Sequence, residues 1–134
     1  MSSQTMMQRD RASASLGIEV LTDQAGYAVV RMTVRDDMLN GFDIIHGGLV
    51  FALADTAFAV ACNEDDDVTV GASADITFLK SAPAGAVLTA TARRLVRKGR
   101  TGLYDVSVVD ETGDTVAEFR GRSVTTRRPA PIAS

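Results

Sequence analysis

The chain has 134 residues, which is the length of one domain and enough to bury a core without disulfides or a structural metal. Hydrophobic residues make up 46% of the sequence and charged residues 23%, which is typical of a soluble globular protein, and the net charge of −3 argues against a general nucleic-acid binder. Cys62 is the single cysteine and His46 the single histidine, which excludes an intrachain disulfide and a zinc site made only of nitrogen and sulfur ligands within one chain.

The first half of the chain is expected to contain two helices and one strand. The pattern predicts a short helix over residues 5–16, with Gly17 placed to end it. Residues 27–34 alternate between apolar and polar side chains, which is typical of a half-buried strand. Residues 36–45 contain an Asn-Gly pair and are expected to form a loop. Residues 47–63 are rich in alanine and leucine and predict a helix whose start is marked by two glycines.

The second half of the chain is expected to form strands. Four segments have strand-like patterns, namely 69–79, 87–96, 103–109 and 116–126, and residues 110–114 resemble a hairpin turn between the last two. Helices and strands are thus segregated along the chain, which predicts the α+β class with a mostly antiparallel sheet. We expect this sheet to wrap around the long apolar helix of the first half.

The whole chain, residues 1–134, is expected to be one domain, with a frayed tail over residues 127–134. Its start lacks the long apolar stretch of a secretory signal. The most apolar run, residues 47–62, is too short to span a bilayer, which takes about 20 residues. We therefore expect a cytoplasmic protein that binds neither membrane nor nucleic acid.

The predicted long helix carries a single carboxylate among apolar residues. Between Gly48 and Cys62 every residue is apolar except Asp55 and Thr56. Because a helix that is apolar on all sides is usually buried, the Asp55 carboxylate must be paired, raised in pKa or open to a cleft. It either hydrogen-bonds a neighbouring loop or acts as a general base or nucleophile.

The start of this helix offers a place for a carbonyl oxygen. The first N–H groups of a helix lack intrahelical partners and carry the positive end of its dipole, and Gly47 allows a ligand atom to approach the backbone closely. The alternative is a turn that needs glycine for its dihedral angles. Gly47 and Asp55 are eight residues apart, roughly 12 Å along a helix axis. One helix therefore cannot hold the carbonyl oxygen of an acyl group at its N-terminus and attack the carbon of the same group with its own Asp55. A functional site here therefore requires a homodimer with the site at its interface.

Several other residues have two interpretations each. Asn40 either forms the Asn-Gly turn or positions a water molecule or Asp55, and His46 either donates to a substrate carbonyl or orders the loop. Cys62 is expected to be a small core residue. Five basic residues lie within eight positions: Arg93, Arg94, Arg97, Lys98 and Arg100. They either hold a phosphorylated ligand or form a solvated hairpin rim.

Two stretches form a specific pattern, Asn40-Gly41 and the run His46-Gly-Gly-Leu-Val-Phe-Ala-Leu-Ala-Asp-Thr-Ala-Phe-Ala-Val-Ala-Cys-Asn63. Further matching segments are Ala74–Leu79, Leu88–Ala92, Gly102–Val106 and Val116–Ser123. Together these residues resemble the hotdog-fold acyl-CoA thioesterases, and more narrowly the phenylacetic acid degradation thioesterase (PaaI) family. The resemblance covers most of the chain, roughly from residue 16 to residue 123.

The resemblance implies an antiparallel sheet wrapped around one central helix, in dimers that usually pair into tetramers. It implies hydrolysis of the thioester of phenylacetyl-CoA or of ring-hydroxylated phenylacetyl-CoA, with no cofactor or metal. On matching positions, Asp55 is the catalytic carboxylate, the Gly47 N–H holds the thioester oxygen, His46 assists and Asn40 orients the attacking water or the thioester. Further contacts with the substrate are expected from Gly48, Phe51, Thr56, Lys80, Lys98, Arg100 and Thr101.

Three alternatives remain beside this hypothesis. The first is a thioesterase of the same fold that acts on other aryl or medium-chain acyl-CoAs. The second is a non-catalytic acyl-CoA-binding protein, although the segment before Gly17 is too short for the DNA-binding module of a fused regulator. The third is hydratase or dehydratase chemistry, which usually relies on a histidine base within the helix, whereas His46 precedes it.

Overall fold

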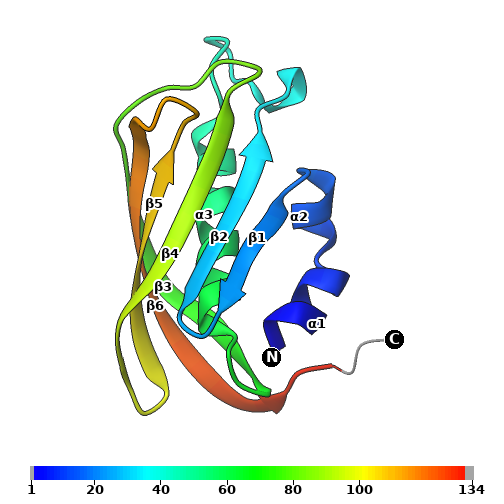
Figure 1. Ribbon diagram of the computed structural model, residues 1–134, viewed down its shortest axis with the longest axis vertical. Coiled ribbons are helices and arrows are strands. Elements are labelled where there is room, and N and C mark those ends of the chain that lie inside the picture. Colours follow the sequence, from blue (N-terminus) through cyan, green and yellow to red (C-terminus); the bar gives the residue numbers. More distant parts are fainter. Residues whose placement is uncertain (1, 132–134) are drawn as a thin grey trace.

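A computed structural model describes residues 2–131 and shows one curved sheet around one long helix (Figure 1). The strands are β1 (Glu19–Gln24), β2 (Tyr27–Thr33), β3 (Asp67–Phe78), β4 (Val87–Lys98), β5 (Thr101–Val109) and β6 (Thr115–Pro129). They form a six-stranded sheet in the order β1-β2-β4-β5-β6-β3, and every neighbouring pair is antiparallel. The expected α+β class with a sheet wrapped around a helix is confirmed.

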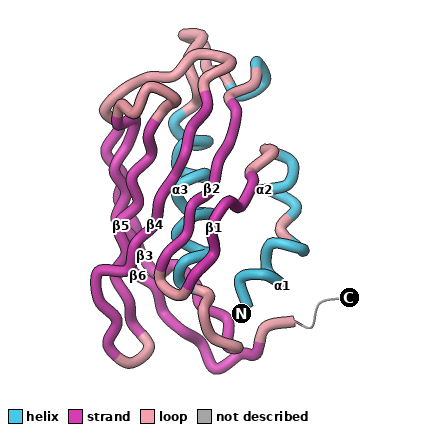
Figure 2. Tube along the Cα trace, viewed as in Figure 1, coloured by secondary structure: helices cyan, strands magenta, loops and turns pink. Residues whose placement is uncertain are grey.

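The long helix α3 (Gly47–Cys62) fills the concave side of the sheet, as the Cα trace in Figure 2 also shows. On the side of α3 that faces the sheet, the ring centroid of Phe58 lies 5.4 Å from that of Tyr104 and 5.7 Å from that of Phe119. Glycines on two adjoining strands make room for this ring, since a Cβ atom would lie 3.1 Å from it at Gly71 and 2.8 Å from it at Gly121. Close packing of small and large residues thus fixes the helix against the sheet.

One face of α3 is left without cover by the sheet. We call it the uncovered stripe; its members are Gly48 and Asp55, which are exposed, and Phe51, Ala52 and Ala59, which are half-buried. Their spacing of three and four residues places them on one side of the helix. The expected burial of α3 on all sides is therefore wrong for this stripe in the single chain.

The N-terminal segment forms two short helices and not the single helix expected over residues 5–16. They are α1 (Ser2–Arg9) and α2 (Arg11–Ser15). The break falls at Asp10, whose extended backbone and side-chain acceptor cap the start of α2. Gly17 ends this segment with a φ of +69°, as expected of a glycine after a helix.

The strands differ from expectation at the edges of the sheet. β1 was not expected; most of its residues are exposed at a sheet edge, and a bulge interrupts its register, so its sequence alternates weakly. A short 3₁₀ helix, η1 (Asp36–Met38), lies within the expected loop. β6 runs to Pro129, which pairs with Asp67, so the first residues of the expected frayed tail belong to the sheet. Residues 132–134 of that tail lie outside the described residues.

Within residues 2–131, none of the helices combines the length and the apolar character that crossing a membrane requires. The same residues contain no group of three or more His, Cys, Asp or Glu side chains placed to hold a metal ion.

Candidate active site

The N-terminus of α3 is organised by His46, which is the N-cap residue. Its backbone is extended, with φ −63° and ψ 129°, and its Nδ1 accepts a hydrogen bond of 3.0 Å from the Gly48 N–H. A neutral imidazole whose Nδ1 accepts carries its hydrogen on Nε2. Because His46 is exposed, this Nε2–H is available to a ligand at the helix start. The same geometry allows His46 to order the start of the helix through Nδ1 and to donate to a substrate carbonyl through Nε2.

The Gly47 N–H is an unused donor at the same place. Among the described residues 2–131 it has no protein acceptor, whereas the N–H groups of Leu49 and Val50 both reach the His46 carbonyl. The ring of Phe78 lies over Gly47, so that a Cβ atom there would sit 3.2 Å from Cζ of the ring. An N–H at the positive end of a helix, with no protein acceptor and on a residue that has no side chain of its own, is suited to hold a carbonyl oxygen or an oxyanion.

A hollow of about 350 Å³, which we call the N-terminal hollow, opens beside this donor. Its lining includes Asn40, Gly47, Val50, Phe78, Leu79 and Lys80. The Asn40 Oδ1 accepts from the Phe42 N–H at 2.8 Å, and its backbone carbonyl accepts from the Asp43 N–H at 3.1 Å. Asn40 therefore forms the turn and lines the hollow with Gly47 as well.

Asp55 stands on the uncovered stripe, two turns from the N-terminal hollow. It is exposed in the single chain, yet the apolar side chains around it desolvate its carboxyl and raise its pKa, and the charge of Asp10 raises it further. Because α3 is continuous from Gly47 to Cys62, Gly47 and Asp55 stay roughly 12 Å apart along the axis. One chain does not bring them together.

Two expected substrate contacts lie near Asp55 on α3. Phe51 belongs to the uncovered stripe and packs edge-on against Phe119, with ring centroids 5.4 Å apart. Thr56 is buried, and its hydroxyl donates to the Ala52 carbonyl at 2.8 Å and touches the hydroxyl of Ser13 at 3.0 Å. The Thr56 side chain thus points toward α2.

Lys80 lies at the rim of the N-terminal hollow, with its ammonium held by two carboxylates. Its Nζ is 2.6 Å from Asp110 and 2.8 Å from Asp114, both in the turn between β5 and β6. These hydrogen bonds raise the pKa of Lys80 and lower that of Asp110. The lysine is therefore anchored to its own chain beside the hollow.

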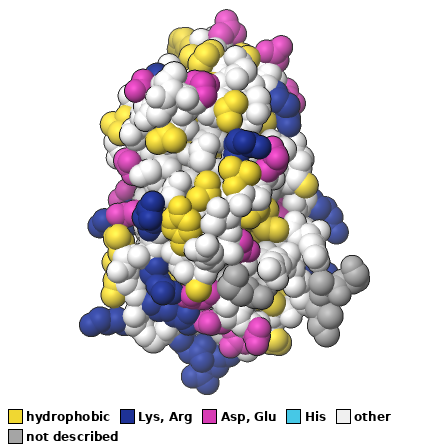
Figure 3. All heavy atoms as spheres, viewed as in Figure 1, with side chains coloured by type: hydrophobic (Ala, Val, Ile, Leu, Met, Phe, Trp, Pro, Cys, Tyr) yellow, Lys and Arg dark blue, Asp and Glu magenta, His cyan; other side chains and the backbone are white. Residues whose placement is uncertain are grey.

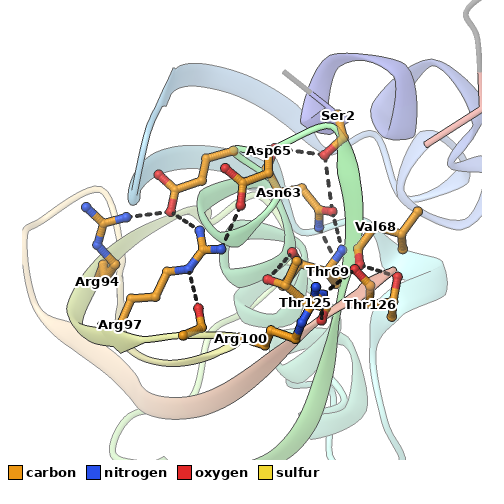
Figure 4. Close-up of polar contacts among 12 residues, drawn as sticks. Ser2, Asn63, Asp65, Val68, Thr69, Arg94, Arg97, Arg100, Thr125 and Thr126 are labelled. Carbon is orange, nitrogen blue, oxygen red and sulfur yellow. Dashed lines mark hydrogen bonds and ion pairs between the residues drawn. The ribbon is translucent and has the colours of Figure 1, made fainter. Parts of the chain in front are cut away.

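The basic hairpin between β4 and β5 lies at the other end of the molecule, where Figure 3 shows Lys and Arg side chains beside acidic ones. Arg97 pairs with Glu64 at 3.1 Å and with Asp65 at 2.7 Å, and Arg94 also pairs with Glu64 (Figure 4). Arg100 donates to the backbone carbonyls of Thr125 and Thr126. The expected contacts Lys98, Arg100 and Thr101 are thus far from Gly47 within one chain.

Two neighbours of the expected site residues were not expected from the sequence: Phe78, which covers Gly47, and Asp10, which acts on Asp55. An available signal for Asp10 was its residue type, because aspartate is among the preferred residues for an N-cap. For Phe78 no local signal exists, because β3 is distant from Gly47 in sequence.

Comparison with known proteins places this geometry in a family. A family model described as the thioesterase superfamily matches residues 42–117, which is more than half of the chain and includes the whole of α3. The chain belongs to the thioesterase superfamily. The acyl-coenzyme A thioesterase PaaI of Escherichia coli is 45% identical over 118 residues, which are 88% of this chain and 84% of that protein. A 1,4-dihydroxy-2-naphthoyl-CoA hydrolase of Listeria monocytogenes is 31% identical over 73% of this chain and 81% of its own length.

Solved structures of the thioesterase superfamily confirm the hotdog fold. The structure of E. coli PaaI, from the phenylacetic acid degradation operon, superimposes with a TM-score of 0.92 at 41% identity, covering 96% of this chain and 93% of that one. A mutant of the phenylacetic acid degradation protein PaaI from Thermus thermophilus has a TM-score of 0.82 at 37% identity and covers 87% of this chain and 100% of that one.

Proposed function

We propose that this thioesterase hydrolyses acyl-CoA, with phenylacetyl-CoA or ring-hydroxylated phenylacetyl-CoA as its substrate class, in phenylacetate catabolism in the cytoplasm. The observation that carries the proposal is the unused Gly47 N–H at the start of α3, beside the N-terminal hollow. The likeness to E. coli PaaI supports the choice of acyl-CoA, and the likeness to a naphthoyl-CoA hydrolase supports an aromatic acyl group.

The thioester carbonyl is proposed to bind at the start of α3. Its oxygen accepts from the Gly47 N–H and from His46 Nε2–H, and the helix dipole favours the negative charge that grows on this oxygen as the carbon becomes tetrahedral. The Phe78 ring lies beside this donor. Asn40, on the same hollow, orients the water or the thioester.

Asp55 is proposed to drive the attack on the carbonyl carbon. As a general base it takes a proton from water while the water oxygen bonds to the carbon; as a nucleophile its own oxygen forms that bond, and water later cleaves the resulting anhydride. Either route breaks the carbon–sulfur bond and releases the acid and the CoA thiol. Both require the ionised carboxylate.

The complete site is proposed to combine Gly47 of one chain with Asp55 of the partner subunit. The 12 Å separation within one helix requires this. β3 is an edge strand of 12 residues, with the exposed side chains of Val70 near its start and Phe78 at its end. The unpaired N–H and C=O groups of such an edge are a template for pairing with a strand of a second chain. We propose a homodimer paired along β3, which brings the uncovered stripes of two α3 helices together, and a dimer of dimers built from it.

The remaining contacts with CoA are proposed from the same arrangement. Gly48, Phe51 and Thr56 surround the acyl group from α3. Lys80 stands at the rim of the hollow, and Lys98, Arg100 and Thr101 supply the basic hairpin for the CoA phosphates. The charges of Arg94 and Arg97 are already balanced by Glu64 and Asp65. An anionic ligand would therefore bind at the tip of the hairpin, at Lys98, Arg100 and Thr101.

The proposed function is tested by thiol release from straight-chain, benzoyl and phenylacetyl thioesters of CoA, with the wild-type protein and Asp55→Asn in parallel. We expect phenylacetyl-CoA to be hydrolysed with the highest kcat/KM. Asp55→Asn should lower kcat by roughly 10²–10⁴-fold, the typical contribution of a catalytic base, while still binding the substrate. Binding without release by the wild-type protein would instead indicate a non-catalytic acyl-CoA-binding protein. An undiminished rate in Asp55→Asn would refute the assignment of Asp55.

A further inference from the structure

A further hollow of about 430 Å³ lies between α1, the start of β3 and the end of β6, and we call it the α1 hollow. This volume is within the range of pockets that hold small molecules. Its walls are largely apolar and include Met6, Val68, Val70, Ala130 and Pro131. The Asn63 side chain also lines it and joins the end of α3 to β3, because Nδ2 donates to the Thr69 carbonyl at 3.0 Å and Oδ1 accepts from the Thr69 N–H at 2.9 Å (Figure 4). The elements on two sides of the hollow are therefore fixed relative to each other.

The α1 hollow runs along the second half of α3, starting at the level of Asp55. One end is lined by Asp10, whose Oδ2 accepts a hydrogen bond of 2.6 Å from the Ser13 hydroxyl. The Ser13 hydroxyl lies 3.0 Å from that of Thr56, which follows Asp55 on α3. The other end is lined by Asn63, eight residues after Asp55, which is roughly 12 Å further along the helix axis. A ligand bound at Asp55 can therefore extend over this length into the hollow.

Two arginines stand at the mouth of the α1 hollow. Arg9 and Arg128 line it and are exposed, and within residues 2–131 neither forms an ion pair with a carboxylate. Asp10 is the one acidic residue that residues 2–131 contribute to the lining, and both of its carboxylate oxygens accept hydrogen bonds from Ser13. The mouth therefore suits an anionic group, and the apolar walls suit an uncharged part of the same molecule.

The homodimer proposed above brings the α1 hollow beside the thioester. Two identical strands that meet across a two-fold axis pair antiparallel, so the start of β3 in one chain, with Val68 and Val70, lies beside the end of β3 in the other. The end of β3 carries Phe78, whose ring lies over Gly47. The α1 hollow of the chain that supplies Asp55 therefore opens next to Gly47 of the partner subunit, where the thioester oxygen is proposed to bind.

We propose that the α1 hollow binds the pantetheine arm of the acyl-CoA substrate and that Arg9 and Arg128 bind the diphosphate at its mouth. The inference rests on the proposed function, because it starts from a thioester held between Asp55 and the partner subunit's Gly47. The arm is uncharged, and it measures roughly 15 Å from the sulfur to the diphosphate when extended. Since the far end of the hollow lies roughly 12 Å beyond Asp55, an arm of this length spans it and leaves the diphosphate at the arginines, which bind phosphate through paired N–H groups.

The mouth of the α1 hollow adjoins the basic hairpin between β4 and β5. The Arg128 N–H donates to the Thr126 hydroxyl at 3.1 Å. Arg100, at the tip of the hairpin, donates to the Thr126 carbonyl at 3.1 Å (Figure 4). With the diphosphate at Arg9 and Arg128, the hairpin is left for the 3′-phosphate of CoA. The acyl group then lies on the other side of the carbonyl, between the uncovered stripes of the two α3 helices.

The arginines are tested by comparing phenylacetyl-CoA with phenylacetyl-pantetheine, which has the same thioester and arm but no phosphate. In the double variant Arg9→Gln/Arg128→Gln we expect KM for phenylacetyl-CoA to rise roughly 10-fold at low salt, the order for two charge-assisted contacts open to solvent, with kcat unchanged. The rise should shrink as salt is added. For phenylacetyl-pantetheine, KM should change by less than about twofold, because the lost charges have no phosphate to bind.

The matched control is Arg11→Gln/Arg127→Gln. It makes the same change in net charge at neighbouring exposed positions that do not line the hollow, and KM for both thioesters should stay within about twofold of wild type. Arg9→Lys/Arg128→Lys keeps the charges and should recover part of the affinity for phenylacetyl-CoA.

The position of the arm is tested by Ala130→Phe, which fills part of the α1 hollow from a half-buried position at the end of β6. We expect KM to rise for phenylacetyl-CoA and for phenylacetyl-pantetheine alike, because both carry the arm. An unchanged KM for both thioesters would show that the arm binds elsewhere.

A KM for phenylacetyl-CoA that is the same in Arg9→Gln/Arg128→Gln as in wild type would overturn the inference, and so would an equal rise for both thioesters. Calorimetric binding of free CoA to the same variants needs no turnover, and the double variant should bind CoA more weakly by a similar factor. This measurement separates a failure of the inference from a failure of the proposed function, which would show as a wild-type protein that releases no thiol from any acyl-CoA.

Discussion

The surroundings of the Asp55 carboxyl group and its proposed role favour opposite protonation states. Its place on the uncovered stripe of an apolar helix disfavours the ionised form, and the proposed reaction needs that form. The neighbouring side chains therefore make Asp55 a stronger base than an aspartate in water. The Gly47 N–H is a comparable case at the other end of the proposed site, because a donor that has no acceptor among residues 2–131 is ready for a substrate oxygen.

The raised pKa of Asp55 predicts the pH dependence of activity. The folded-state pKa lies above the ordinary value of about 3.9, and only the ionised form is active. Activity is then complete above this raised pKa and falls about tenfold per pH unit below it. Measuring kcat/KM for phenylacetyl-CoA from pH 4 to pH 9 checks this expectation. An acid limb at or below the ordinary aspartate value would show that desolvation does not act on the group that limits the rate.

How far single residues could be predicted depends on how local their partners are. The geometry of His46 and Gly47 involves residues within the same helix start, so the sequence indicates it directly. Lys80 is different, because its partners Asp110 and Asp114 lie 30 and 34 residues away and meet it only in the folded sheet. The same holds for the pairing of Arg97 with the loop that follows α3.

At the scale of elements, α3 is held in place by the fit of the Phe58 ring against two glycines. The strong apolar pattern of α3 and the regular alternation of β2 and β5 made these elements predictable. β1 lacks such alternation because it is an exposed edge, and the break between α1 and α2 depends on the cap at Asp10. The helix position is set by tertiary packing, which no local pattern contains.

Gly121→Ala tests this fit. The added Cβ would lie 2.8 Å from Cε2 of Phe58, a ring that is 1% exposed and therefore cannot move aside without disturbing the core. We expect a loss of roughly 1–3 kcal/mol in the free energy of unfolding, measured by denaturant titration. The matched control is Gly41→Ala, since a Cβ at Gly41 meets nothing within 4 Å. Equal midpoints for Gly121→Ala and wild type would mean that the packing around Phe58 is looser than described.

At the scale of the whole molecule, the single chain carries every residue of the proposed active site but does not bring them together. Gly47 lies at the start of α3 and Asp55 two turns further along it. The uncovered stripe and the outer edge of β3 are both accessible in the single chain. The proposal of a second chain follows from the sequence alone, because it depends only on the rise of a helix and the spacing of two residues. The proposed pairing along β3 could not be inferred from the sequence, because the place of β3 at the sheet edge emerges only from the strand order.

Mixed dimers test this shared site most directly. Gly47→Pro removes the N–H at the first helical position, where the backbone tolerates proline, and the extended His46 before it, with ψ 129°, accommodates a following proline. The proline Cβ would meet the Phe78 ring at 3.2 Å, and this ring is 53% exposed, so it has room to move aside. Gly47→Pro and Asp55→Asn chains with different tags are co-expressed, and heterodimers are isolated through both tags. Each variant alone should be inactive, and the heterodimer should recover about half of the wild-type rate of phenylacetyl-CoA hydrolysis, since one of its two sites is intact. Verified heterodimers no more active than the two parent variants would contradict a site built from two chains.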